Sequence, residues 1–340
     1  MNRKFNDETI EASSFILSKV FKKPEIHAIL FIDMISVTIP LSKEQARKFY
    51  SLQKYRTADY RFKLKHLDGK DAGQQKYKRR LDANFSDGST LSIFLFGLNE
   101  LQNPVKIFFN PNRVSLRNAA TILQLIQDLL GHCSYQLSML SGNVTRVDYA
   151  LDLPNVPFRH VITDYAYSPS YYPFFEHDSR TGYRYGDKTG CPISAYDKAK
   201  EQGGQYLGFT KYTRIEKQQK PRVRGAKSMF KVAEMDKQKY SFQGLIFYDP
   251  NILVNMPNRV YTLIEQFGIG KALTLLDGSD HRILKKKMEK YRLDRGASFK
   301  TVLENTYQER MNHLKLLLTE PQRFITDHDN VKSRIRDFQS

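Results

Sequence analysis

Residues 145–152 read Thr-Arg-Val-Asp-Tyr-Ala-Leu-Asp, and the rest of the chain is interpreted around this stretch. In a β-strand, successive side chains point to opposite faces. One face of this strand is apolar, with Val147, Tyr149 and Leu151. The other face is charged, with Arg146, Asp148 and Asp152. Such a strand can pack against a core on one side and carry chemistry on the other.

Two later stretches repeat this division into a polar and an apolar face. Residues 194–198, Ser-Ala-Tyr-Asp-Lys, place Tyr196 and Lys198 on one face. Residues 212–216, Tyr-Thr-Arg-Ile-Glu, place Tyr212, Arg214 and Glu216 on one face. If the three strands are neighbours in one sheet, their polar faces form a single site that holds carboxylates, arginines, a lysine and a tyrosine.

The composition is strongly basic. The chain has 54 Lys and Arg against 36 Asp and Glu, a net charge of +18 that is spread over both halves. This excess favours a polyanionic partner, usually nucleic acid. Cys133 and Cys191 cannot form a disulfide framework or a CxxC metal site, which fits a reducing compartment. No apolar run suits a membrane span or signal peptide, so we expect a cytoplasmic protein with no membrane partner.

Short alternating segments predict an antiparallel meander in the first part of the chain. The expected strands lie within 26–41 and over 60–67, 77–85, 90–96 and 105–109. Helices are expected over 42–52 and 115–130, where Ser42 and Ser115 are N-caps. We further expect a docked helix within 1–24, a short helix near 158–166 and a long loop over 167–191.

From about residue 240 the pattern becomes helical, with helices expected over 257–267, 281–292 and 298–318. Lys285, Lys286 and Lys287 are candidate DNA-phosphate contacts, although a charge run is often only a solvated face. The predicted fold class is α+β, a mainly antiparallel central sheet flanked by helices with a smaller helical C-terminal region. The expected regions are a catalytic domain over 1–220, a basic connection over 221–240 and a helical region over 241–340.

The residue types suggest metal-assisted phosphoryl transfer. Asp148, Asp152 and Glu216 are hard oxygen ligands of the kind that Mg²⁺ or Mn²⁺ prefers. Tyr196 beside Lys198 is a candidate nucleophile, because a deprotonated tyrosine can attack phosphorus. A simpler interpretation stays open: arginine–aspartate pairs on sheets are often ordinary salt bridges, and strand tyrosines usually pack. No HxH, HExxH or GxxxxGK[ST] motif occurs, so neither a histidine-paired metal site nor ATP use is supported.

The order of four short motifs across residues 26–220 resembles rolling-circle replication initiators. The motifs are FIDM at 31–34, TRVD at 145–148, AYDK at 195–198 and TRIE at 213–216. Two branches are similar: the gene II endonuclease of filamentous phages and the plasmid initiators called Rep_trans. In the phage branch, the resemblance implies that Tyr196 is the DNA-linking nucleophile.

The acids and the tyrosine differ between the two branches. Asp148 and Glu216 match the acids of the phage motifs, whereas Asp152 looks more like the plasmid branch. The plasmid branch also tends to have a tyrosine just before a glycine. Residues 183–186, Tyr-Arg-Tyr-Gly, therefore make Tyr183 and Tyr185 alternative nucleophiles or DNA contacts.

The resemblance implies a metal-dependent tyrosine nickase and strand transferase that starts rolling-circle replication of a phage or plasmid through a 5′-phosphotyrosine intermediate. Lys198, Arg146 and Arg214 would stabilise phosphate charge. The expected partners are double-stranded origin DNA, single-stranded DNA, and the replicative helicase and polymerase of a bacterial host cell. The alternatives are a conjugative relaxase, a non-catalytic origin-binding replication protein and an RNA-binding protein.

Overall fold

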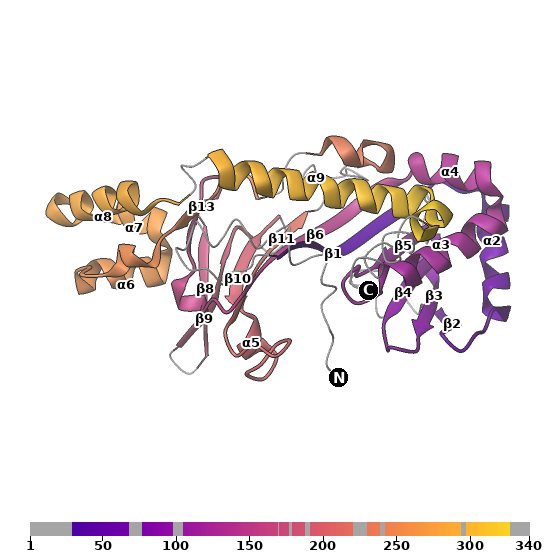
Figure 1. Ribbon diagram of the computed structural model, residues 1–340, viewed down its shortest axis with the longest axis horizontal. Coiled ribbons are helices and arrows are strands. Elements are labelled where there is room, and N and C mark those ends of the chain that lie inside the picture. The colour runs from indigo at the N-terminus through magenta and orange to yellow at the C-terminus, as the bar shows by residue number, and fades with distance from the viewer. Residues whose placement is uncertain are drawn as a thin grey trace, which may run out of the picture. The chain divides into compact units, whose positions relative to one another are not determined.

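The structure is a computed structural model that describes residues 29–67, 77–97, 105–168, 170–176, 179–187, 191–219, 230–238, 242–293 and 297–326 (Figure 1). The chain forms two compact units that alternate along the sequence. The site unit takes its described residues from Met1–Phe31, Tyr149–Gln219 and Lys239–Gln308. The meander unit takes its described residues from Ile32–Asp148, Lys220–Gln238 and Glu309–Ser340. The helix expected within residues 1–24 lies outside the described residues.

An 11-stranded, mostly antiparallel sheet provides strands to both units, which confirms the predicted α+β class. In the meander unit the strand order is β2-β3-β4-β5-β1-β6, with the short β12 (Phe230–Lys231) also paired to β6. The bounds are β1 Ile29–Ile39, β2 Tyr60–His66, β3 Tyr77–Phe85, β4 Thr90–Gly97, β5 Val105–Phe109 and β6 Asn143–Pro154. The strands expected from alternation in this part of the chain are therefore confirmed.

The helices of the meander unit begin where their capping residues predict. Ser42 caps α2 (Lys43–Lys48) with a capping box, and the 3-10 helix η1 (Phe49–Lys54) continues it. Ser115 accepts a hydrogen bond from the Asn118 backbone N–H at the start of α3 (Leu116–Leu130). The helix α4 (His132–Leu140) follows directly after Gly131. Helix α9 (Ala297–Thr319) enters this unit at Glu309, and the Tyr135 hydroxyl donates to the Leu318 carbonyl at 2.6 Å.

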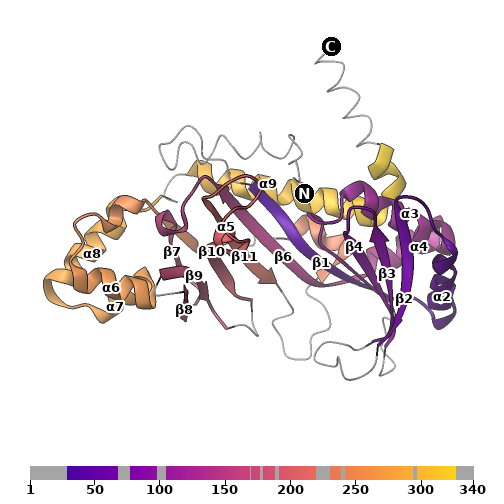
Figure 2. The ribbon, with the colours of Figure 1, turned by 90° about the horizontal axis from the view of Figure 1, so that it is seen from below.

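In the site unit the strand order is β6-β11-β10-β9-β8, and Figure 2 shows β11, β10 and β9 side by side. The bounds are β8 Tyr171–Glu176, β9 Ser179–Tyr185, β10 Ile193–Asp197 and β11 Tyr212–Gln219. A separate pair joins β7 (Ile162–Tyr165) to β13 (Leu245–Tyr248). The loop expected over 167–191 is therefore wrong, because β8 and β9 form a hairpin there. The helix expected near 158–166 is limited to η3 (Phe158–His160) before β7.

Three helices of the C-terminal region pack around one apolar cluster of the site unit. They are α6 (Asn258–Phe267), α7 (Ile269–Leu275) and α8 (Gly278–Tyr291), with the short η5 (Pro250–Leu253) beside them. Ile252, Val260, Ala272 and Leu284 at its centre are fully buried. The apolar spacing confirms the expected helices over 257–267 and 281–292, while α7 was not expected.

The region expected as a basic connection is partly structured. η4 (Val232–Lys237) follows β12, and Lys315 on α9 bonds to the Ala233 carbonyl at 2.8 Å. The chain changes unit at 219/220 and at 238/239, and the described residues of 149–219 and 239–308 belong to the same unit. The functional division into a catalytic domain and a C-terminal region stays a prediction.

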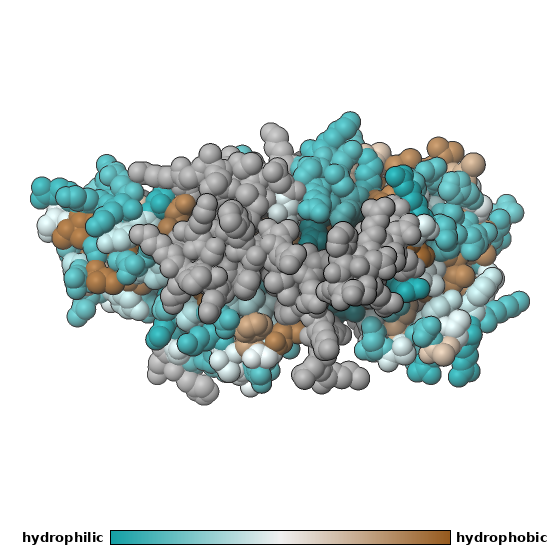
Figure 3. Space-filling model, in the orientation of Figure 1, coloured by the Kyte–Doolittle hydropathy of each residue, from teal (hydrophilic) through white to brown (hydrophobic). Residues whose placement is uncertain are grey.

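On the face shown in Figure 3, the described residues are mainly hydrophilic, with small groups of apolar side chains between the polar ones. Within the described ranges, no helix has both the length and the apolar character needed to cross a membrane.

Candidate active site

The register of β10 and β11 brings the two predicted polar stretches together. Tyr196 lies opposite Arg214, and Ser194 lies opposite Glu216. Directly opposed residues of an antiparallel pair point to the same face. We call this the open face of the site unit. Figure 1 shows α5 (Lys198–Glu201) and the beginning of α9 on opposite sides of β10 and β11. Lys198 Nζ lies 5.5 Å from the centre of the Tyr196 ring, so α5 lies on the open face.

The Tyr196 hydroxyl donates a hydrogen bond to Glu216 Oε1 at 2.6 Å. Burial raises the pKa of this phenol well above its ordinary value, and the negative charge of Glu216 raises it further. The tyrosine is therefore held as a neutral phenol. A carboxylate within hydrogen-bonding distance is in position to accept the phenol proton as the oxygen attacks.

Arg214 is a fixed cation beside Tyr196. Its Nε lies 2.6 Å from Asp152 Oδ1 and its Nη2 lies 2.7 Å from Asp152 Oδ2. The Tyr212 hydroxyl donates to the same carboxylate at 2.7 Å. Burial alone would lower the pKa of Arg214, but the charge of Asp152 outweighs it and raises the pKa. The guanidinium also lies 5.0 Å from the centre of the Phe31 ring.

Lys198 provides a second cation at the first residue of α5. Its Nζ lies 5.5 Å from the ring centres of both Tyr196 and Tyr206, and it pairs with Glu201. The side chain is largely buried, with 10% of its surface exposed. Sequence reasoning missed Tyr206, which lies in the connection before β11 and has no periodic signal. It also missed the role of Tyr212, although its position two residues before Arg214 places both on one strand face.

The predicted metal ligands are engaged by other side chains of the protein. Both Asp152 oxygens bind Arg214, and one Glu216 oxygen binds Tyr196. In the meander unit, Asp148 binds the guanidinium of Arg146, with Nε 2.9 Å from Oδ1. Across the described ranges, no group of three or more His, Cys, Asp and Glu side chains is arranged to hold a metal ion. In this arrangement, these carboxylates do not fit an Mg²⁺ or Mn²⁺ site.

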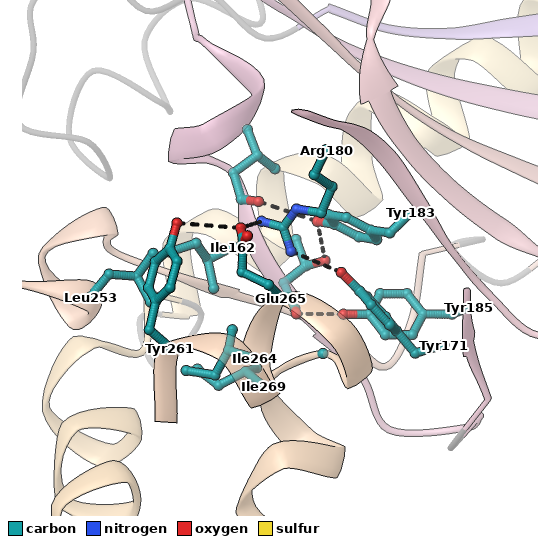
Figure 4. Close-up of a pocket in the computed structure, with 13 residues that line it drawn as sticks. Ile162, Tyr171, Arg180, Tyr183, Tyr185, Leu253, Tyr261, Ile264, Glu265 and Ile269 are labelled. Carbon is teal, nitrogen blue, oxygen red and sulfur yellow. Dashed lines mark hydrogen bonds and ion pairs between the residues drawn. The ribbon is translucent and has the colours of Figure 1, made fainter. Parts of the chain in front are cut away.

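Tyr183 and Tyr185 point to the face opposite Tyr196. On β9 they lie opposite Ala195 and Ile193, and each is 3% exposed. Their hydroxyls bond to the side chain and carbonyl of Thr163 at 2.7 and 2.5 Å (Figure 4). Burial raises the pKa of both phenols. This packing leaves neither ring exposed for stacking on a base.

The same two tyrosines line a small pocket with Arg180 and Glu265. Figure 4 shows the Arg180 guanidinium between the Tyr171 hydroxyl, at 3.0 Å, and Glu265, at 3.4 Å. The cavity volume of about 20 Å³ is enough for roughly one water molecule. The pocket is therefore too small for a nucleotide.

The three lysines of α8 have different surroundings. Lys285 and Lys286 are exposed. Lys287 Nζ donates hydrogen bonds to the carbonyls of Val254 and Ile252, so it caps the C-terminal end of η5. Two of the three predicted phosphate contacts are therefore open to solvent, and their contact with DNA stays a prediction.

Comparison with known proteins finds structural similarity but no sequence match. No family profile and no curated protein matches the sequence. Among solved structures, the chain is similar to the rolling circle replication initiator protein from Geobacillus stearothermophilus, at 14% sequence identity and a TM-score of 0.32. The match covers 57% of this chain and 74% of that chain.

Proposed function

We propose that this chain is a site-specific single-strand DNA endonuclease and strand transferase that starts rolling-circle replication, with Tyr196 as its nucleophile. One observation carries the proposal: on the open face, the Tyr196 hydroxyl donates to Glu216 beside the fixed cation Arg214. A nucleophile, a proton acceptor and a positive charge are the groups that a phosphoryl transfer of this type requires.

In the proposed reaction, the Tyr196 oxygen attacks the phosphorus of a DNA phosphodiester while its proton passes to Glu216. A bond forms between the tyrosine oxygen and phosphorus, and the bond from phosphorus to the 3′ oxygen breaks. The 3′ oxygen leaves and takes a proton from water. The products are a 5′-phosphotyrosine and a free 3′-hydroxyl, whose reverse reaction rejoins the strand. Arg214 and Lys198 stabilise the negative charge of the transition state.

Dependence on Mg²⁺ or Mn²⁺ stays a prediction from the family resemblance, because the predicted carboxylates are bound to arginine and tyrosine. Adduct formation with either metal and with a chelator tests this dependence. Origin DNA, single-stranded DNA and the host helicase and polymerase are the proposed partners.

The test of the proposal is Tyr196→Phe. This substitution removes one oxygen and keeps the ring, so the protein should fold and still bind DNA. The covalent protein–DNA adduct, measured by denaturing gel after incubation with the replicon's own origin, should disappear. Tyr185→Phe is the matched control because its hydroxyl lies on the opposite face, and it should keep the adduct. An adduct that persists in Tyr196→Phe and is lost in Tyr185→Phe would move the nucleophile to β9.

A non-catalytic origin-binding protein is the second candidate. It is favoured by the arginine and tyrosine partners of Asp152 and Glu216, which occupy carboxylate oxygens that a metal ion would need. Origin binding by the unmodified protein, with no adduct under any metal condition, would select this candidate.

A further inference from the structure

A strip of aromatic and basic side chains continues the open face from Tyr196 to the outermost described strand of the sheet. On neighbouring strands, Phe174 lies opposite Gly182, which in turn lies opposite Tyr196. In the adjacent row, Tyr172 lies opposite Arg184. The pairing places these side chains on the face that carries Tyr196, away from the buried Tyr183 and Tyr185.

Arg184 contacts both aromatic rings of the strip, which consists of Tyr172, Phe174 and Arg184. Its guanidinium carbon lies 4.8 Å from the Tyr172 ring centre and 5.7 Å from the Phe174 ring centre. The Arg184 Nε donates to the Gly186 carbonyl at 3.1 Å, and the Tyr172 hydroxyl donates to Asp187 at 2.7 Å. These bonds fix the two side chains while 39% of Tyr172 remains exposed. The strip is therefore preorganised and accessible in the described structure.

Gly182 brings the strip close to the proposed nucleophile. A Cβ atom at this position would lie 2.8 Å from Phe174 Cδ2 and 2.9 Å from Tyr196 Cβ. Any other residue would push the aromatic ring and the tyrosine apart. The lack of a side chain here lets the Phe174 ring lie directly beside Tyr196.

We propose that Tyr172, Phe174 and Arg184 bind unpaired bases of single-stranded DNA next to the phosphate that Tyr196 attacks. This inference rests on the proposed function and specifies its substrate. The faces of unpaired bases are free to stack on aromatic rings, and an arginine beside these rings adds positive charge for the DNA backbone. The nearby carboxylate of Glu176 is paired with Lys200 at 3.1 Å, which reduces its repulsion of phosphate.

The test measures binding of the full chain to a fluorescein-labelled oligothymidine of about 12 nucleotides, a length within the range of known single-strand sites. Fluorescence anisotropy gives the affinity. Tyr172→Leu should weaken binding about tenfold, because loss of one stacked base costs roughly 1–3 kcal/mol. Arg184→Gln should also weaken binding. Tyr55→Leu is the matched control: Tyr55 is an exposed tyrosine of the meander unit, and its loss should leave the affinity unchanged.

The possible outcomes separate this inference from the proposed function. If both variants bind oligothymidine as tightly as Tyr55→Leu does, the strip does not bind DNA. The same result is expected if this face binds a protein instead of DNA. Adduct formation by the unmodified protein would still support the nickase. Conversely, if the unmodified protein forms no adduct and both variants bind more weakly, the proposed nickase function is wrong. The inference that the strip binds single-stranded DNA is then still supported.

Discussion

The reactivity of Tyr196 depends on its neighbours on the open face. Because burial and Glu216 raise the pKa of its phenol, attack on phosphorus requires transfer of the proton to a base during the reaction. Glu216 accepts the Tyr196 hydrogen bond, and Arg214 lies 3.6 Å from the same carboxylate. The proposed nucleophile, base and cation thus form one connected group, so a substitution of any one alters the other two.

Arg214→Met should reduce the free energy of unfolding by about 3–5 kcal/mol, because it leaves the buried carboxylate of Asp152 without its cation. Asp152 is 1% exposed, so solvent cannot replace the guanidinium. Urea denaturation measures this loss. Arg323→Met is the matched control, since that arginine pairs with Glu320 while 64% of its side chain is exposed. The control should change stability by less than about 1 kcal/mol. Equal losses in both variants would show that the Asp152 pair is not a major source of stability.

At the scale of single elements, the sequence predicted strands and helices well where one face is apolar and the other polar. The meander strands and α3 are examples, because alternation and capping determine them locally. It failed over 167–191, where the rings of Tyr171, Tyr183 and Tyr185 pack against one another across β8 and β9. That pairing depends on contacts between strands, which no periodicity within one segment reveals.

The candidate site was predictable in its strands but not in its contacts. Period-two alternation correctly predicts that Tyr196, Arg214 and Glu216 share a face, but the strand expected over 194–198 ends at Asp197, and Lys198 begins α5. The choice of partners does not follow from alternation, because Asp152 faces Arg214 only once β6 and β11 are neighbours. The importance of Gly182 could not be predicted from the sequence either. It depends on the close approach of the Phe174 ring, which lies on the neighbouring strand.

Strand β3 contains a buried carboxylate that makes stability depend on pH. Asp82 contacts Arg80 Nε at 2.6 Å, Ser92 Oγ at 2.8 Å and Lys65 Nζ at 2.8 Å. Burial alone would raise the pKa of Asp82, but these contacts outweigh it and lower the pKa. A carboxyl group whose pKa is lowered in the folded state stabilises the fold at pH values above its unfolded-state pKa of about 4. This contribution is lost as the pH falls through the folded-state pKa.

Asp82→Asn should therefore be destabilising by about 1–3 kcal/mol at pH 7 and by progressively less below about pH 4. Urea unfolding of both proteins between about pH 2 and 7 checks this convergence. The exposed Asp59 provides a control, because Asp59→Asn removes a carboxylate that solvent surrounds. A stability difference between Asp82→Asn and the unmodified protein that stays constant over this range would contradict the role assigned to the Asp82 charge.

For the molecule as a whole, the charge of +18 should make DNA affinity fall steeply with salt, because bound phosphates release counterions. Replacing Lys285 and Lys286 with Gln should make the salt dependence less steep if α8 touches the DNA backbone. Affinity measured from about 50 to 200 mM salt gives the slope. Lys287→Gln is a contrasting variant that should lower stability, since this lysine binds carbonyls of η5. An unchanged slope in the double variant would exclude the helix from DNA contact.

The alternation of the two units along the chain has a consequence for synthesis on the ribosome. Local hairpins of the meander unit can form early, but the Tyr135 hydroxyl meets the Leu318 carbonyl only after 183 further residues have been made. Contacts of such long sequence separation form slowly, and the apolar surface that α9 will cover stays exposed to solvent in the meantime. The nascent chain should therefore depend on chaperones until α9 has emerged.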